Sequence, residues 1–326
     1  MMKLGQVALS ALVGVPIASL YALLVWLTFA AGDFSLFLAT MTCSFLFLVP
    51  PAIGALTVYF APQEYRRSTP YALLMPWISI TIVCIGSIAF SLEAMICILM
   101  ALPIFLVLSS IGGYLFLYRN RDKDNRPTQQ NTMLGIILLA PYLFSPFEMR
   151  LPINTSYKIV ENKITIDAPA NTVWENIITI PQIGPNEQGF SIFHAFGVPK
   201  LLETSALTQA GIGGLRTTMF DNGLAFTETV TYWDQNNRIN FSISPSDQTT
   251  APAPFSMIGK KHFAVTKMNY WIEPVDQDTI ILHITSQHQL TTHFNSYAGI
   301  WTNFMLSSLQ NYVLQMIKAR AENPST

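Results

Sequence analysis

The chain has 326 residues, of which 51% are hydrophobic and only 11% are charged, against about 25% charged residues in an ordinary soluble domain. Its 18 Lys and Arg nearly balance its 19 Asp and Glu, so the net charge of −1 argues against a nucleic-acid-binding protein, which needs a basic face. The high apolar fraction excludes a disordered chain, and the length predicts two folding units.

The few charges of residues 1–150 are grouped in the sequence. They leave five long windows without any charged side chain, and a helix needs about 20 mostly apolar residues to cross the hydrocarbon core of a membrane. We therefore predict an all-α transmembrane domain in this half. The predicted spans lie near residues 6–30, 34–60, 70–90, 94–118 and 130–147.

Basic residues predict the orientation of these spans. The loops at 31–33 and 91–93 contain no Lys or Arg, whereas the other connections and the N-terminus hold Lys3, Arg66, Arg67, Arg119, Arg121, Lys123 and Arg126. Cytoplasmic loops are enriched in Lys and Arg. We expect a multi-pass protein of a bacterial inner (plasma) membrane with its N-terminus in the cytoplasm.

The fifth predicted span is the weakest of the set. Its apolar core, residues 133–147, is short and contains Pro141 and Pro146. If it crosses the membrane, as we expect, the rest of the chain is extracytoplasmic, in the periplasm of such a bacterium. If it is an interfacial or re-entrant segment, the rest of the chain is cytoplasmic.

The second half, residues 151–326, has the periodicity of an α+β domain. Alternation over 158–167 predicts a half-buried strand, and Pro169 opens a short helix that ends at Pro181. Residues 190–200 look irregular. Further strands are predicted over 201–209, 215–220, 225–233, 238–244, 263–273 and 279–290, with Asp221-Asn222-Gly223 as a hairpin turn.

A long amphipathic helix is predicted from about residue 295 to residue 322, where apolar side chains repeat every three or four positions. Lys318 and Arg320 lie in its last turn and complement the helix dipole. A run of strands followed by a terminal helix predicts an antiparallel sheet with helices on one face.

Several short motifs of this half precede the terminal helix. They are Lys163-Ile-Thr-Ile-Asp-Ala-Pro-Ala-Asn-Thr-Val-Trp174, Gly197-Val-Pro, Gly211-Ile-Gly-Gly-Leu-Arg216 and Phe226-Thr-Glu-Thr-Val-Thr-Tyr-Trp233. In this order, and with the terminal helix, they resemble the START/polyketide-cyclase (SRPBCC) superfamily. The resemblance covers about 155–322. It implies a helix-grip fold, in which a curved sheet wraps around the last helix and encloses an apolar cavity for lipids, sterols, polyketides or other hydrophobes.

Arg216 and Glu228 are the first candidates for a polar group in such a cavity. A three-residue turn at 221–223 places them opposite each other, on the face that also carries Phe226 and Tyr232. They would then anchor the head group of a ligand, or form a structural salt bridge or a surface pair. A two-residue turn would instead place Glu228 opposite Thr217 and remove the pairing.

His288, Trp301 and Phe304 complete the candidate cavity residues. His288 shares a strand face with Ile280, Leu282, Ile284 and Leu290, so it either looks into the cavity or is an ordinary core or rim histidine. Trp301 and Phe304 belong to the apolar stripe of the terminal helix. No metal-ligand spacing and no nucleotide motif is present, so we expect neither a metal nor another cofactor.

These observations favour a membrane protein whose START-like domain binds a lipid or another hydrophobic small molecule at the membrane surface. The expected partners are membrane lipids and that ligand, and no nucleic acid. Two alternatives remain: a cyclase- or dehydratase-like enzyme that uses the same cavity, or a membrane-tethered interaction module without a ligand.

Overall fold

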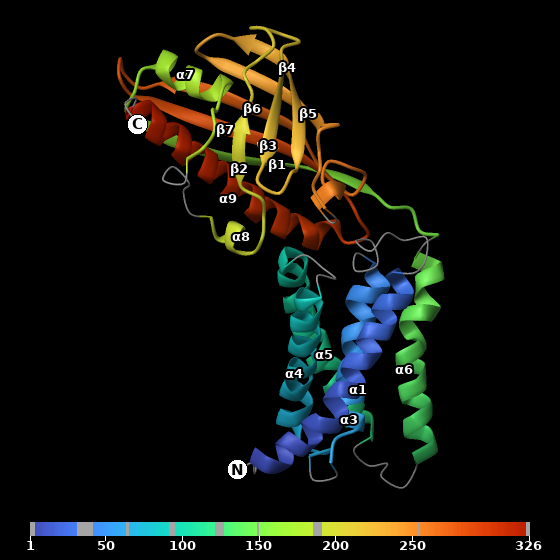
Figure 1. Cartoon of the computed structure of the whole chain (residues 1–326). Coiled ribbons are helices and arrows are strands. Elements are labelled where there is room, and N and C mark those ends of the chain that lie inside the picture. The colour runs from blue at the N-terminus through green and yellow to red at the C-terminus, as the bar shows by residue number, and fades with distance from the viewer. Residues whose placement is uncertain are drawn as a thin grey trace. The chain divides into compact units, whose positions relative to one another are not determined.

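The chain divides into two compact units, Met1–Pro152 and Ile153–Thr326 (Figure 1). The computed structural model describes residues 4–30, 42–62, 65–90, 95–120, 127–148, 150–184, 191–252 and 255–323. The predictions made for Lys3, Arg121, Lys123, Arg126 and the loops at 31–33 and 91–93 therefore lie outside the described residues.

The described part of the first unit is helical. Its segments are α1 (Leu4–Ala30), a π-helical turn η1 (Ser44–Leu48) that continues into α3 (Val49–Tyr59), α4 (Thr69–Ala89), α5 (Met95–Asn120) and α6 (Pro127–Glu148). Local sequence explains where α4 begins, because the Ser68 hydroxyl caps the helix by accepting a hydrogen bond from the Tyr71 amide.

Glycines bring α3 and α5 into close contact. A methyl group on Gly54 would overlap the Ser109 carbonyl, and a methyl group on Gly112 would overlap the backbone of Pro51. Small residues of this kind let two helix backbones approach within a membrane, where packing replaces the hydrophobic effect as the force between helices. The two helices thus pack backbone to backbone.

The structure does not support five membrane spans. Among the described residues, α4 and α5 are the two helices that are long and apolar enough to cross a membrane. In the described part of the second predicted span, the apolar helix is Ser44–Tyr59, which is shorter than the hydrocarbon core, and the described apolar part of α1 is Val13–Thr28. In α6, polar residues occupy the first turns and leave only a short apolar run.

The second unit is an α+β domain built on one seven-stranded antiparallel sheet with the order β1-β7-β6-β5-β4-β3-β2. Sequential hairpins build most of it, and β1 closes the sheet beside β7. The strands are β1 (Thr155–Ile166), β2 (Leu201–Thr204), β3 (Leu215–Phe220), β4 (Ala225–Asp234), β5 (Arg238–Pro245), β6 (Phe263–Pro274) and β7 (Ile280–Thr291).

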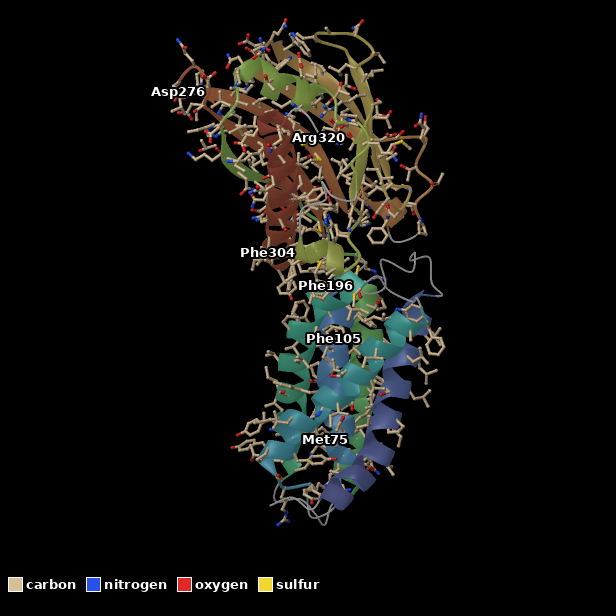
Figure 2. All side chains as sticks on the ribbon, turned by 60° about the vertical axis from the view of Figure 1, so that its left-hand side comes forward. Met75, Phe105, Phe196, Asp276, Phe304 and Arg320 are labelled. Carbon is tan, nitrogen blue, oxygen red and sulfur yellow. The ribbon has the colours of Figure 1, made fainter. Side chains whose placement is uncertain are left out.

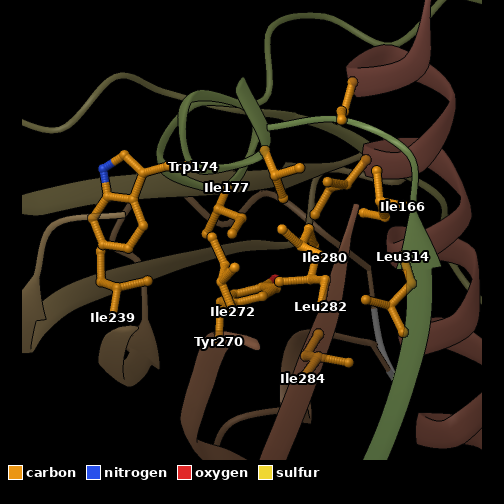
Figure 3. Packing of buried hydrophobic residues seen from close by; sticks show 14 of the residues in the cluster. Ile166, Trp174, Ile177, Ile239, Tyr270, Ile272, Ile280, Leu282, Ile284 and Leu314 are labelled. Atoms are coloured by element: carbon orange, nitrogen blue, oxygen red, sulfur yellow. The ribbon is translucent and has the colours of Figure 1, made fainter. Parts of the chain in front are cut away.

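The long helix α9 (Asn295–Glu322) lies in the hollow of the curled sheet, beside β1 and β7 (Figure 1). Apolar side chains from the inner faces of the strands pack on α9 and on α7 (Ala170–Ile178), and the cluster includes Ile166, Trp174, Leu282 and Leu314 (Figure 3). The α+β fold with a terminal helix, predicted from the sequence, is the observed arrangement and fits a helix grip.

Two local predictions need correction. The strand predicted over 201–209 ends at Thr204. The next residues stay beside β3 through two separate bonds, from the Ser205 amide to the Thr217 carbonyl and from the Thr208 amide to the Leu215 carbonyl, before the chain turns at Gly211 and Gly213, which adopt positive φ. The region expected to be irregular contains a short helix, α8 (Ile192–Ala195), which packs against α9 through the Phe193 ring.

Candidate ligand-binding site

Arg216 on β3 and Glu228 on β4 face each other across the hairpin, in the register that a three-residue turn predicts. Gly223 in that turn has a φ of 83°, a conformation that glycine adopts without strain. The Arg216 Nε and Nη2 atoms both lie 2.7 Å from Glu228 Oε2. The two side chains are buried, so their charges compensate each other away from water.

Further contacts complete this pair. The Thr218 hydroxyl donates to Glu228 Oε1 at 2.8 Å, and Arg216 Nη1 donates to the Ile177 carbonyl at 2.6 Å. The guanidinium also lies over the Phe241 ring, 4.1 Å from its centroid. Both oxygens of Glu228 thus already accept hydrogen bonds within the protein. A role of the pair as an anchor for a ligand stays a prediction.

Phe226 lies on the same face of β4 as Glu228, as the sequence predicts, whereas Tyr232 does not. Phe226 is buried with Leu224 and Ala251 near the end of the hairpin. A β-bulge between Val230 and Tyr232 shifts the register of β4, so that Tyr232 turns outward and is 44% exposed. An extra residue in a strand exchanges its two faces beyond that point, and strict alternation therefore mispredicts Tyr232.

His288 lies on the inner face of β7, as its strand position predicts, and is 0% exposed. Its Nε2 lies 3.0 Å from the Thr302 hydroxyl of α9, whereas its Nδ1 has no hydrogen-bond partner among the described residues. Burial, followed by the nearby charge of Lys158, lowers the pKa of His288 to about 4. The imidazole is therefore neutral at neutral pH.

Polar side chains beside His288 form a network that the sequence analysis missed. Asn162 of β1 donates to Gln310 Oε1 of α9 at 2.6 Å, and Gln310 Nε2 donates to Ser286 Oγ of β7 at 2.7 Å. Gln310 and Ser286 are buried. One signal in the sequence could have indicated this network: an Asn and a Ser stand on the apolar faces of two predicted strands. A buried polar side chain requires a hydrogen-bond partner.

The two aromatic candidates on α9 differ in exposure. Trp301 is half-buried, whereas Phe304 is 58% exposed and meets the Phe193 ring of α8 edge to face, with centroids 5.0 Å apart. Figure 2 labels Phe304 on α9. The apolar stripe of α9 thus continues beyond the core to a surface beside α8. Whether these two residues contact a ligand stays a prediction.

His194 of α8 is a functional candidate that the sequence did not single out. Its ring meets the Tyr312 ring edge to face at 4.9 Å, and neither ring nitrogen has a hydrogen-bond partner among the described residues. Burial lowers its pKa, and the charge of Lys200 adds to that effect. A helix as short as α8 shows no periodic pattern in the sequence. The sequence therefore did not predict that His194 lies against α9.

Comparison with solved structures finds resemblance in the second half of the chain. A START superfamily protein from Mycobacterium smegmatis is 12% identical with a TM-score of 0.36, and the match covers 51% of this chain and 99% of that one. A Streptomyces aromatase/cyclase is 15% identical, with a TM-score of 0.33 and coverage of 52% and 97%.

A truncated norcoclaurine synthase from Thalictrum flavum is 10% identical, with a TM-score of 0.30 and coverage of 51% and 97%. No family model matches the sequence, and no curated protein matches it. The resemblance that the sequence motifs predicted is thus also found among solved structures, as a resemblance of fold.

Proposed function

We propose that this chain is a membrane protein whose START-like second unit binds a hydrophobic small molecule at the membrane surface. His288 is the observation that carries the proposal. Its ring is buried between the sheet and α9, and Nδ1 has no partner among the described residues. A buried polar atom without a hydrogen bond costs about 1–3 kcal/mol, so a ligand that bonds to Nδ1 would stabilise the domain.

The hydrogen-bonding chemistry of His288 indicates which class of ligand would suit this position. A neutral imidazole has one nitrogen that donates and one that accepts, and the Thr302 hydroxyl at Nε2 is compatible with either tautomer. A ligand hydroxyl also both donates and accepts, so it suits Nδ1 in either case. We therefore expect an apolar ligand that carries a hydroxyl group, with its hydrocarbon part among the apolar side chains under α9.

Binding is better supported than catalysis. Both oxygens of Glu228 accept hydrogen bonds from Arg216 and Thr218. The pKa of about 4 makes His288 a weak base at neutral pH. Glu228 and His288, the two acid–base candidates of the sequence, therefore do not support the cyclase- or dehydratase-like alternative, and the same buried polar atom argues against an interaction module without a ligand.

Analysis of co-purified compounds in the full-length protein tests the proposal. Wild type, His288→Leu and His283→Leu are purified in lipid nanodiscs, extracted with organic solvent and compared by mass spectrometry. His283 is the matched control, because it lies on the opposite face of the same strand. We expect an apolar compound that is enriched about tenfold in wild type and His283→Leu over His288→Leu. Identical extracts from all three proteins would refute the proposal.

We also propose that the chain crosses the membrane more than once, with the N-terminus in the cytoplasm and the second unit on the other side. The apolar helices α4 and α5 support more than one crossing. Two crossings return the chain to the side on which it started, so this topology also requires α6 to cross. Arg66 and Arg67 lie around one small crevice with Asn120 and Gln130, which flank the other basic connection, and this grouping supports a cytoplasmic position for both connections.

Reporter fusions test this topology. Alkaline phosphatase, which is active only outside the cytoplasm, is fused after Thr326 in one chain and after Asn120 in the other, and green fluorescent protein replaces it in a parallel pair. We expect phosphatase activity after Thr326 and fluorescence after Asn120. Fluorescence at both positions would show that α6 does not cross the membrane.

A further inference from the structure

The helical unit contains an apolar cavity of about 210 Å³. It lies among four helices, to which α1 contributes Trp26, α3 contributes Ile53, α4 contributes Ile82 and α5 contributes Phe105. No Asp, Glu, Lys, Arg or His belongs to its described lining. The cavity therefore suits a ligand without charge.

The cavity lies at one particular end of the helical unit. Its lining comes from the C-terminal halves of α1 and α4 and from the N-terminal half of α5. At this end Glu148, the last residue of α6, accepts hydrogen bonds from the amide and the hydroxyl of Ser44. Figure 2 shows Phe105, which lines the cavity, and Met75 at different heights along the helices.

The basic connections mark the opposite end. Met75 packs there with Tyr65 and Tyr71, close in sequence to Arg66 and Arg67. The cavity thus belongs to the end at which α6 stops and the chain continues toward the second unit. In the proposed topology this end is extracytoplasmic.

The volume and lining indicate the class of ligand. A cavity of about 150 Å³ holds a benzene molecule, so 210 Å³ holds about eight or nine carbon atoms. Leu23 and Ile82 belong to the lining and are also exposed, which shows that the cavity reaches the surface between α1 and α4. A longer hydrocarbon chain can therefore enter with one end and leave the remainder outside.

Ser19 is a polar residue in the lining of this apolar cavity. Its Oγ atom is buried, lies in the lining and has no hydrogen-bond partner among the described residues. A hydroxyl can donate to a single carbonyl or hydroxyl oxygen. We propose that the cavity binds the hydrocarbon chain of a lipid, with a neutral oxygen of that lipid near Ser19. This site is separate from the site under α9 and does not depend on it.

Photolabelling of the full-length protein tests this site. The probe is the methyl ester of dodecanoic acid with a diazirine at the chain end, added to protein in nanodiscs of saturated phosphatidylcholine, and labelled peptides are identified by mass spectrometry. We expect saturable labelling of peptides that contain Trp26 and Phe105, which an excess of the methyl ester without the diazirine removes. This measurement on the wild type decides the proposal even where a variant does not fold.

Two cavity-filling variants and one control sharpen the test. Gly86 and Ala101 line the cavity. Gly135 of α6 is the matched control, since a methyl group on Gly86 or on Gly135 meets no atom within 4 Å. We expect Gly86→Leu and Ala101→Leu to lower the saturable labelling about fivefold or more, and Gly135→Leu to leave it unchanged. Labelling that does not saturate, or that neither filling variant lowers, would overturn the proposal.

Discussion

His283 and His288, both on β7, lie on opposite faces of the sheet. His283 stacks on Trp271 of the neighbouring strand, with ring centroids 4.4 Å apart, and its Nε2 lies 2.9 Å from the Glu273 carboxylate. His288 instead points toward α9 and bonds to Thr302. An odd separation along a strand exchanges the faces, so two identical side chains have different surroundings.

The surroundings of His288 predict that the stability of the second unit depends on pH. His288 has a pKa of about 4 in the folded protein against 6.5 as its ordinary value, so the unfolded chain binds its proton first. The stability of the second unit should therefore fall as the pH decreases from about 6.5 to about 4, by up to about 3 kcal/mol from this group, and level off below. Pulse proteolysis in urea across this range, on the full-length chain, measures the effect.

His288→Gln should remove that part of the pH dependence, whereas His283→Gln should retain it. Equal pH profiles for wild type and His288→Gln would show that His288 becomes protonated in the folded protein as readily as in the unfolded chain.

Removal of one partner of the Arg216–Glu228 pair should destabilise the second unit strongly. In Glu228→Gln the buried guanidinium loses its countercharge, and we expect a loss of about 3–5 kcal/mol in the free energy of unfolding. The double variant Arg216→Met with Glu228→Leu should recover most of this loss, because it removes both charges. Glu175→Gln on the exposed face of α7 is the control and should change little.

The β-bulge in β4 makes a prediction about two adjacent aromatic residues. Trp233 packs edge to face on Trp174 at 5.1 Å, whereas Tyr232 is largely exposed. Trp233→Ala should therefore cost about 2–4 kcal/mol of stability and Tyr232→Ala less than about 1 kcal/mol. Urea unfolding of both variants gives the comparison. The reverse order would mean that β4 keeps a regular register in solution.

Glu148 should stabilise the helical unit, since it caps the backbone where η1 begins. Its carboxylate accepts hydrogen bonds from the amides of Cys43 and Ser44 and from the Ser44 hydroxyl. Glu148→Ala should cost about 2 kcal/mol, and Ser44→Ala less, because Ser44→Ala keeps both amide bonds. Thermal unfolding of the two variants in nanodiscs measures the difference. Equal melting temperatures for Glu148→Ala and wild type would contradict this role.

Elements that local periodicity defines were predictable from the sequence. The terminal helix was expected from about 295 to 322 and is α9, and the alternation over 158–167 corresponds to β1. The side of the sheet on which His288 lies was predictable for the same reason, because a strand alternates its faces at every residue. The turn at 221–223 likewise set the opposition of Arg216 and Glu228.

Other features depend on partners that are distant in the sequence. The bulge that reverses Tyr232 and Trp233 is a property of the pairing between β4 and β5. The network from Asn162 to Gln310 joins the two ends of the second unit. The prediction of five membrane spans rested on stretches of sequence without charged residues. The length of such a stretch does not show where a helix begins or ends.

The sequence alone determined the separation into an apolar half and an α+β half, the resemblance to START proteins and most strand faces, since each follows from composition or from contacts between near neighbours. Only the tertiary structure decided which buried polar atoms have partners, and where four helices leave a cavity. Both depend on how segments that are distant in the sequence pack against each other. A single β-bulge, or a glycine where two helices meet, is enough to change that packing.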